Sequence, residues 1–207
     1  MAASQIEKDD VAGNSWMVET KLSEELLAKA KMAGVDKGEA YMKFVEQDEG
    51  KGGYLAAELP AKALMEPLRE IFEREKFEAI KSSLSGRLHL SVAGGFEMRS
   101  SGLKKHNIER KKRGIPLGPQ SYRITKFVCL KKKEKTGIMI RNIVAITECA
   151  GVDSERKRWL GTDARSQVAH ITLSRLSSKW KKKWDEIEKY GKREEALVVK
   201  IGKMGLK

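Results

Sequence analysis

The sequence predicts an α+β fold with antiparallel strands, and two patterns carry this prediction. Several segments alternate apolar and polar residues with a period of two, which is typical of strands with one buried face. Other segments place apolar residues three and four positions apart, which is typical of helices. The expected strands cover 54–59, 88–92, 122–130, 138–147, 169–173 and 196–201, and the expected helices cover 23–34, 36–47, 60–83, 156–160 and 178–190.

The boundaries of the first elements follow from local signals. Gly34 is expected to end the helix that Ser23 begins. Asp36 and Glu39 form a variant of the capping box, and this motif predicts the short helix that follows. Glycines over 50–53 then separate this region from the first strand.

The later elements are placed by proline, glycine and charge. Pro60 is expected to open the long helix, and Pro67 is an alternative first turn. Its inward stripe is expected to comprise Leu64, Leu68, Ile71, Phe72, Glu75 and Ala79. Residues 100–120 are rich in glycine, proline and basic side chains, and they predict a long basic loop. A lysine-rich turn over 131–137 is expected to join two strands into a hairpin.

Composition limits the class of protein. The chain of 207 residues is long enough to bury a core without disulfides. Cys129 and Cys149 are expected to be reduced core residues rather than a metal pair or a bridge. No run of about 18 apolar residues predicts a membrane span, and the first residues lack the profile of a signal peptide. We therefore expect a monomeric cytoplasmic protein without membrane contacts.

Two of the three histidines occur in the same pattern of apolar, His, apolar, hydroxyl and apolar residues. The copies are Leu88-His89-Leu90-Ser91-Val92 and Ala169-His170-Ile171-Thr172-Leu173. On a strand, residues i and i+2 face the same side, so each imidazole has a hydroxyl beside it. If the two strands are adjacent, both pairs face one cleft. The alternative is two partly buried histidines, each satisfied by its own neighbouring hydroxyl.

This pair of motifs resembles the signature of the 2H phosphoesterases, which include ligT-like RNA 2′,3′-cyclic phosphodiesterases and the 2′,3′-cyclic-nucleotide 3′-phosphodiesterases. The resemblance covers roughly residues 50–176, although Ser91 stands where threonine is commoner. It implies a bilobal fold in which two small antiparallel sheets flank a central cleft, with helices outside. It also implies that residues 1–50 are an N-terminal polar and helical extension and that 51–207 form the catalytic domain.

The resemblance further implies a hydrolase that uses no metal and no cofactor. His89 and His170 would be the catalytic acid and base, in an order that the sequence leaves open, and Ser91 and Thr172 would bind the phosphate. Imidazole suits both proton transfers because its pKa lies near neutrality. The substrates would be 2′,3′-cyclic phosphates on RNA ends or nucleotides, or related 2′-5′ and cyclic oligonucleotides.

Three further residues are candidates for substrate contact. Tyr54 and Phe96 flank the motif strands and could stack on a base, with ordinary core packing as an equal alternative. Arg175 could reach a phosphate, and the alternative is a plain surface arginine. His106 lacks the motif and is expected to be a bystander.

Positive charge is concentrated in the second half of the chain. Residues 1–98 carry 13 basic and 18 acidic side chains, a net charge of −5, whereas residues 99–207 carry 29 and 11, a net charge of +18. A region of this kind attracts polyanions with little regard to their sequence. The charge therefore fits an RNA substrate, and it fits equally well a non-catalytic basic RNA-binding or viral structural protein, which is the alternative function.

Overall fold

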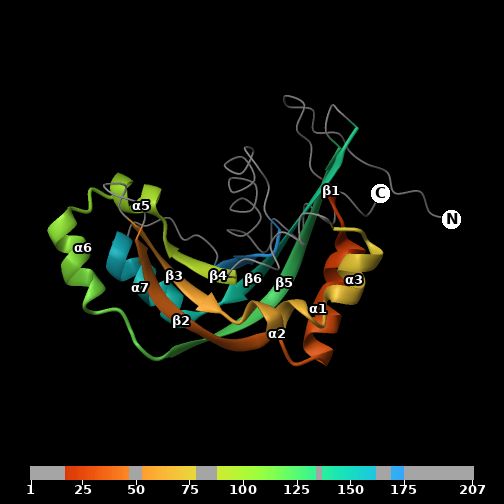
Figure 1. The fold of residues 1–207 in the computed structure, drawn as a ribbon, viewed down its shortest axis with the longest axis horizontal. Coiled ribbons are helices and arrows are strands. Elements are labelled where there is room, and N and C mark those ends of the chain that lie inside the picture. Colours follow the sequence, from red (N-terminus) through yellow and green to blue (C-terminus); the bar gives the residue numbers. More distant parts are fainter. Residues whose placement is uncertain (1–16, 47–52, 78–87, 134–136, 162–168, 175–207) are drawn as a thin grey trace.

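The computed structural model describes residues 17–46, 53–77, 88–133, 137–161 and 169–174. The predicted α+β class is confirmed: every pairing between the described strands is antiparallel, and helices lie at both ends of the sheet (Figure 1). The strands are β1 (Met17–Val18), β2 (Lys37–Glu46), β3 (Gly53–Leu59), β4 (Leu88–Ala93), β5 (Pro119–Lys133), β6 (Met139–Glu148) and β7 (His170–Thr172). The helices are α1 (Thr20–Met32), α2 (Ala61–Met65), α3 (Arg69–Arg74), α5 (Gly95–Ser100), α6 (Lys105–Lys112) and α7 (Ala150–Leu160).

The strands form one sheet whose pairing closes on itself. The strand order is β1-β5-β2-β3-β4-β7-β6, and β5 also pairs with β6. Strand β5 is long enough for both roles because residues 119–123 pair with β2 while residues 123–133 pair with β6. A register shift between Ile124 and Lys126 lies near the point where β5 changes partner. Irregularities of this kind bend a strand, which helps β5 to serve both neighbours.

The sheet has two apolar faces of unequal size. The main core lies on one face and includes residues of α1, α2, α3 and α7 together with the inward positions of the central strands. A smaller cluster lies on the other face and comprises Val128, Leu130, Val144 and Ile146, with Val18 packed against it. The alternation is direct on β5, where Phe127 belongs to the main core and Val128 to the smaller cluster.

Helix α1 forms because its apolar residues recur on one face. Leu22, Leu26 and Ala30 are buried at four-residue steps, and the helix covers β5. The prediction that Gly34 ends this helix is confirmed. Gly34 has a φ of +68°, and its N–H donates to the carbonyl oxygen of Lys31 at 3.0 Å. Glycine suits this position because it adopts positive φ without a Cβ clash.

The predicted helix over 36–47 is wrong, because this segment forms the long strand β2. Ala40 and Met42 are buried on one face, which is a period of two. The strand pairs with β3 on one side and with β5 on the other. A capping box satisfies backbone N–H groups only at the first turn of a helix. Two flanking strands satisfy the backbone hydrogen bonds along the whole segment.

The long helix that was predicted from Pro60 is broken into α2 and α3 around Pro67. The inward residues Leu64, Leu68, Ile71 and Phe72 are buried as expected. Glu75, however, lies past the end of α3, just before Lys76 turns the chain with a φ of +54°. Ala79 and the rest of the prediction to Ser83 fall outside the described residues.

Downstream, the strand predictions are confirmed more closely than the loop prediction. The segment read as a basic loop contains helix α6, and α5 precedes it. The hairpin prediction is confirmed by the pairing of β5 with β6, and the predicted helical turn at 156–160 is the end of the longer helix α7. The predicted helix over 178–190 and strand over 196–201 lie outside the described residues. No helix in the described ranges is long and apolar enough to cross a membrane.

Both cysteines are buried thiols, as the sequence predicted. Burial raises the pKa of the Cys149 thiol, and hydrogen bonds from the backbone of α7 oppose this effect only in part. Since the thiolate is the reactive form, we expect both thiols to react with Ellman's reagent at least about 100-fold more slowly in the native protein than in urea. A fast reaction of one thiol in the native protein would contradict the burial described above.

Candidate motif site on strands β4 and β7

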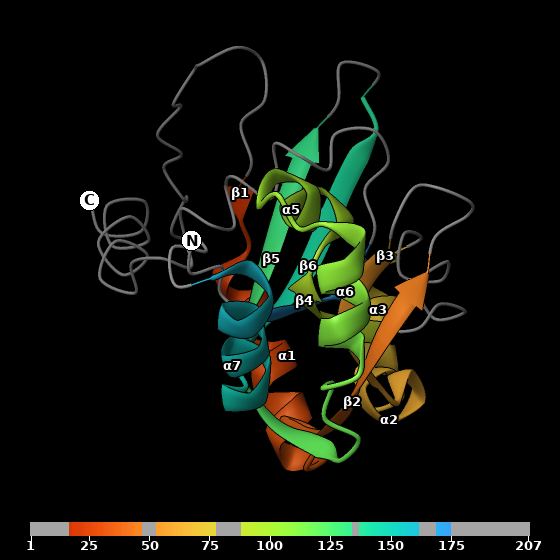
Figure 2. The ribbon, with the colours of Figure 1, turned by 90° about the vertical axis from the view of Figure 1, so that its left-hand side faces the viewer.

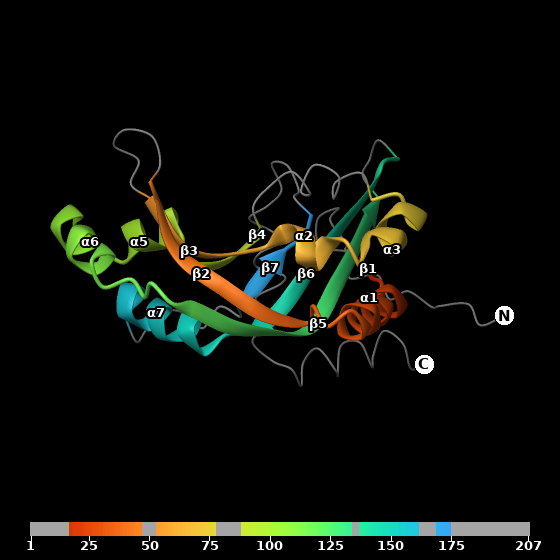
Figure 3. The same ribbon diagram turned by 60° about the horizontal axis from the view of Figure 1, so that its bottom comes forward.

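The two histidine motifs lie on adjacent strands. β4 pairs with β7 in antiparallel orientation, with Leu90 opposite Ile171. Strand β7 is thus held between β4 and β6, as Figure 3 shows. Continuing the register by one residue in each direction places His89 opposite Thr172 and Ser91 opposite His170. Each imidazole therefore has a hydroxyl from the other motif across from it, in addition to the hydroxyl of its own motif.

All four motif side chains share one face of the sheet. Leu90 and Ile171 have no exposed surface and belong to the main core, so the residues on either side of them point to the opposite face. This face, defined by His89, Ser91, His170 and Thr172, is called the motif face below. It is also the face of the smaller apolar cluster, since Ile146 lies opposite His170 and Val144 opposite Thr172.

The two imidazoles have different surroundings. His170 is 5% exposed, whereas His89, Ser91 and Thr172 are half-buried. Both histidines have an interaction partner in the structure. The deeper histidine is flanked by the apolar Ile146 on β6, while the shallower one lies beside polar residues of β3. Similar motifs thus sit in unlike local environments.

Tyr54 lies against the first motif. Its ring centroid is 6.1 Å from that of the His89 imidazole, and the ring planes are tilted by 41°. The tyrosine also packs against the edge of the main core, as the core-packing alternative predicts, and base stacking by Tyr54 stays a prediction. The irregularity between Leu55 and Ala56 helps to orient this end of β3.

Two charged residues near the motifs were not singled out from the sequence. Glu58 on β3 lies directly opposite His89, and directly opposed residues bring their Cβ atoms within about 5.5 Å. Lys126 on β5 lies opposite Ile146 and is half-buried, and it makes no ion pair with any described residue. Its neighbour Phe127 belongs to the main core, so Lys126 points to the motif face. The only sequence signal for either residue is its position in the alternation of its strand, which indicates the face to which it points.

Of the remaining candidates, the structure describes Phe96 and His106, and it brings neither of them to the motifs. Phe96 lies on α5, beyond the end of β4, and it is 71% exposed. The core-packing alternative is therefore wrong for Phe96. Arg175 falls outside the described residues. His106 lies exposed on α6, away from both motif strands.

A buried arginine fixes the end of β4. The Arg156 side chain on α7 is 6% exposed, and its guanidinium donates to the carbonyl oxygen of Val92 at 2.8 Å and to Glu97 at 2.9 Å. Glu97 in turn accepts a hydrogen bond from the Gly94 N–H at 2.8 Å. These contacts tie α7, α5 and the strand that carries His89 and Ser91 into one unit.

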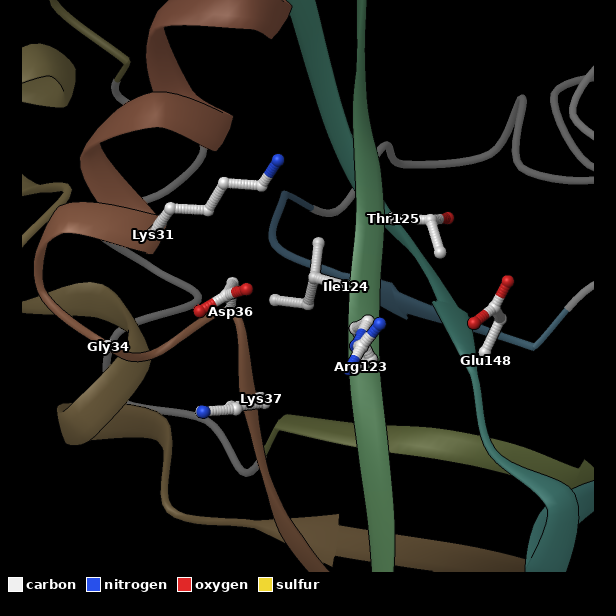
Figure 4. Close-up of a pocket in the computed structure, with 8 residues that line it drawn as sticks. All are labelled: Lys31, Gly34, Asp36, Lys37, Arg123, Ile124, Thr125 and Glu148. Carbon is white, nitrogen blue, oxygen red and sulfur yellow. The ribbon is translucent and has the colours of Figure 1, made fainter.

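A separate cavity of about 470 Å³ lies near the start of β2. Figure 4 shows its lining residues, which are Lys31, Gly34, Asp36, Lys37, Arg123, Ile124, Thr125 and Glu148. Its charged side chains include both signs, and none of the four motif residues contributes to it. The motif face is therefore the stronger candidate for chemistry, because similar reactive groups converge there.

Comparisons with known proteins do not extend this description. Searches against protein-family models, curated proteins and solved structures returned no match. Within the described residues, no group of three His, Cys, Asp or Glu side chains is placed to hold a metal ion.

Arg156 provides a test of how β4 is held. Replacement by methionine removes its charged hydrogen bonds, so we expect Arg156→Met to lower the free energy of unfolding by about 2–3 kcal/mol. The neighbouring Lys157 is exposed, and Lys157→Met should change it by less than about 0.5 kcal/mol. Urea denaturation measures both values. Equal stability of the two variants would show that the arginine does not hold the strand.

Proposed function

We propose that this protein is a 2H-type phosphodiesterase that hydrolyses 2′,3′-cyclic phosphates without a metal ion. The observation that carries the proposal is the pairing of β4 with β7, which sets two His-x-Ser/Thr motifs side by side on one face. The motifs are 81 positions apart in the chain, so no local constraint requires them to meet. Two histidines that were buried independently would have no need of a shared face.

The resemblance implies two small sheets, whereas the described strands form one sheet of seven strands, which can be divided into two halves. Strands β2, β3 and β4 make one half, and strands β7, β6 and β5 make the other. The halves meet where β4 pairs with β7, and β5 joins them again through β2. A phosphate bound at the first junction would contact one motif from each half.

The chemistry requires two proton transfers on opposite sides of one phosphorus atom. One imidazole takes a proton from water as the water oxygen bonds to phosphorus. The other imidazole gives a proton to the ribose O3′ as the bond between O3′ and phosphorus breaks, which leaves a 2′-phosphate and a free 3′-hydroxyl. Ser91 and Thr172 donate hydrogen bonds to the non-bridging oxygens. Holding the phosphate between the imidazoles supplies the orientation that the reaction needs.

The charged neighbours fit this scheme. Glu58 faces His89 across the β3–β4 pair, and a carboxylate that accepts a hydrogen bond from an imidazole orients its ring. Lys126 approaches from the β5 side and would add positive charge near the non-bridging oxygens. Tyr54 contacts the His89 ring and would pack against a base or ribose bound there.

A second candidate function is a binding module without catalysis. The observation that favours it is the net charge of +18 on residues 99–207, which predicts RNA affinity whatever the motifs do. The two functions differ in whether a bond is broken.

The histidines test the catalytic proposal directly. Purified protein in EDTA is expected to hydrolyse 2′,3′-cyclic AMP or an oligonucleotide that ends in a 2′,3′-cyclic phosphate. His89→Ala and His170→Ala should each lower kcat by at least about 100-fold, because each removes one proton transfer. His106→Ala is the matched control and should retain full activity. Product is measured by chromatography, which also identifies the 2′-phosphate.

Two outcomes would contradict the proposal. If the wild-type protein is inert on every such substrate and still binds RNA, the binding module is the correct function. If EDTA abolishes the activity, the reaction follows a different phosphodiesterase chemistry.

The flanking charges give a second test. Glu58→Gln should lower kcat by about 10- to 100-fold, because the His89 imidazole loses the carboxylate that would orient its ring. Lys126→Met should lower kcat/KM by about tenfold, and Lys126→Arg should restore much of the loss. Full activity of Glu58→Gln would exclude the orienting role. Equal activity of the two Lys126 variants would exclude the contribution of its charge.

A further inference from the structure

Helix α6 has an inner face that is fixed to the rest of the protein. Ile108 packs against the main core, and the Lys111 ammonium group donates to the carbonyl oxygens of Arg158 and Trp159 at the end of α7. Partial burial, with a smaller effect from Arg158, lowers the pKa of Lys111. Lys112 pairs with Glu46 at 2.6 Å and lies over the Phe44 ring. These inner-face residues are therefore committed to contacts within the fold.

Exposed cations on α6 and at its two ends make no ion pair with the described acidic residues. They are Lys104, Lys105, Arg110 and Arg113, and this set of exposed cations is called the outer face of α6 below. None of the four makes an ion pair with any residue that the structure describes. Glu109 is the one acidic residue of the helix, and it pairs with Lys112 at 3.1 Å. Exposed cations gathered on one short helix and its two ends attract polyanions.

An exposed aromatic ring lies on the neighbouring helix. Phe96 on α5 is 71% exposed, and only four residues separate α5 from α6. A hydrogen bond of 3.2 Å from the Leu103 N–H to the Met98 carbonyl oxygen ties this connection to α5. Figure 2 shows α5 and α6 together at the same end of the molecule. Cationic side chains and exposed aromatic rings are the groups with which proteins bind single-stranded nucleic acids.

We propose that the outer face of α6 and Phe96 bind single-stranded RNA upstream of the end that reaches the motif face. Strand β4 leads from the motif to α5, and the four steps from His89 to Ala93 span about 13 Å. A mononucleotide at the motifs therefore does not reach α6, whereas an oligonucleotide does. The use of this surface during turnover rests on the proposed function, but RNA binding to it does not.

The chemistry of this surface favours RNA over an anionic membrane. A helix that lies on a membrane needs apolar side chains along the face that it presents. The exposed residues of α6 itself are Lys105, His106, Glu109 and Arg110, and none of them is apolar. One exposed aromatic ring suffices to stack on one base.

Binding of a 12-nucleotide single-stranded RNA with a 3′-hydroxyl end tests the proposal, because this RNA cannot be a substrate. The variant is Lys105→Glu/Arg110→Glu/Arg113→Glu, and fluorescence anisotropy measures Kd as salt is raised. We expect Kd to rise at least tenfold at 0.1 M salt and the slope of log K against log salt to fall by about 2. The matched control Lys21→Glu/Lys31→Glu/Lys62→Glu changes net charge equally on exposed lysines of α1 and α2, and its Kd should stay within twofold.

Further arms separate the alternatives. The variant Lys105→Gln/Arg110→Gln/Arg113→Gln removes charge without reversing it and should also weaken RNA binding. Activity on 2′,3′-cyclic AMP should be unchanged in the α6 variants, while kcat/KM for a cyclic-phosphate oligonucleotide falls. A protein that is inert on all substrates, but loses RNA affinity only in the α6 variants, would support this surface and refute the proposed enzyme. Equal RNA affinity of the α6 and control variants would overturn the inference. It would also be overturned if the α6 variants lost binding to phosphatidylserine vesicles but kept their affinity for RNA.

Discussion

The candidate site depends on a single strand contact, the pairing of β4 with β7 at Leu90 and Ile171. Both residues are fully buried, so hydrophobic burial on the core face holds the two strands in register. The alternation of side chains then determines which groups meet on the other face. A slip of one residue would exchange the histidines with the core residues, and the strong preference of Leu and Ile for the core opposes that slip.

The sequence predicts this site in part, because alternation along a strand shows which of its side chains share a face. The shared pattern around His89 and His170 was sufficient to predict which side chains point together, but not which strands are neighbours. Chain order does not determine pairing. Strand β7 pairs with β4 as well as with β6, although β5 and β6 separate β4 from β7 in the chain. Glu58 and Lys126 escaped prediction for the same reason, since their relation to the motifs exists only across strands.

Local signals failed where long-range contacts competed with them. Asp36 and Glu39 have the spacing of a helix start, yet the segment is a strand because β3 and β5 satisfy its backbone on both sides. The basic region after β4 has glycines and prolines that suggest a loop, yet α6 forms between them. The contacts of Lys111 with α7 and of Lys112 with Glu46 hold this helix against the rest of the protein, and the local composition does not predict them.

The position of β7 bears on the order in which the molecule assembles. Strands β4 and β6 are both made before β7, and until it arrives each has an edge open to other chains. β7 has only three residues and pairs on both sides, so it completes the sheet between β4 and β6. During synthesis, the two imidazoles therefore come together only after the rest of the described sheet has emerged. A nascent chain that stops short of this strand would carry one histidine motif and an unfilled gap in its sheet.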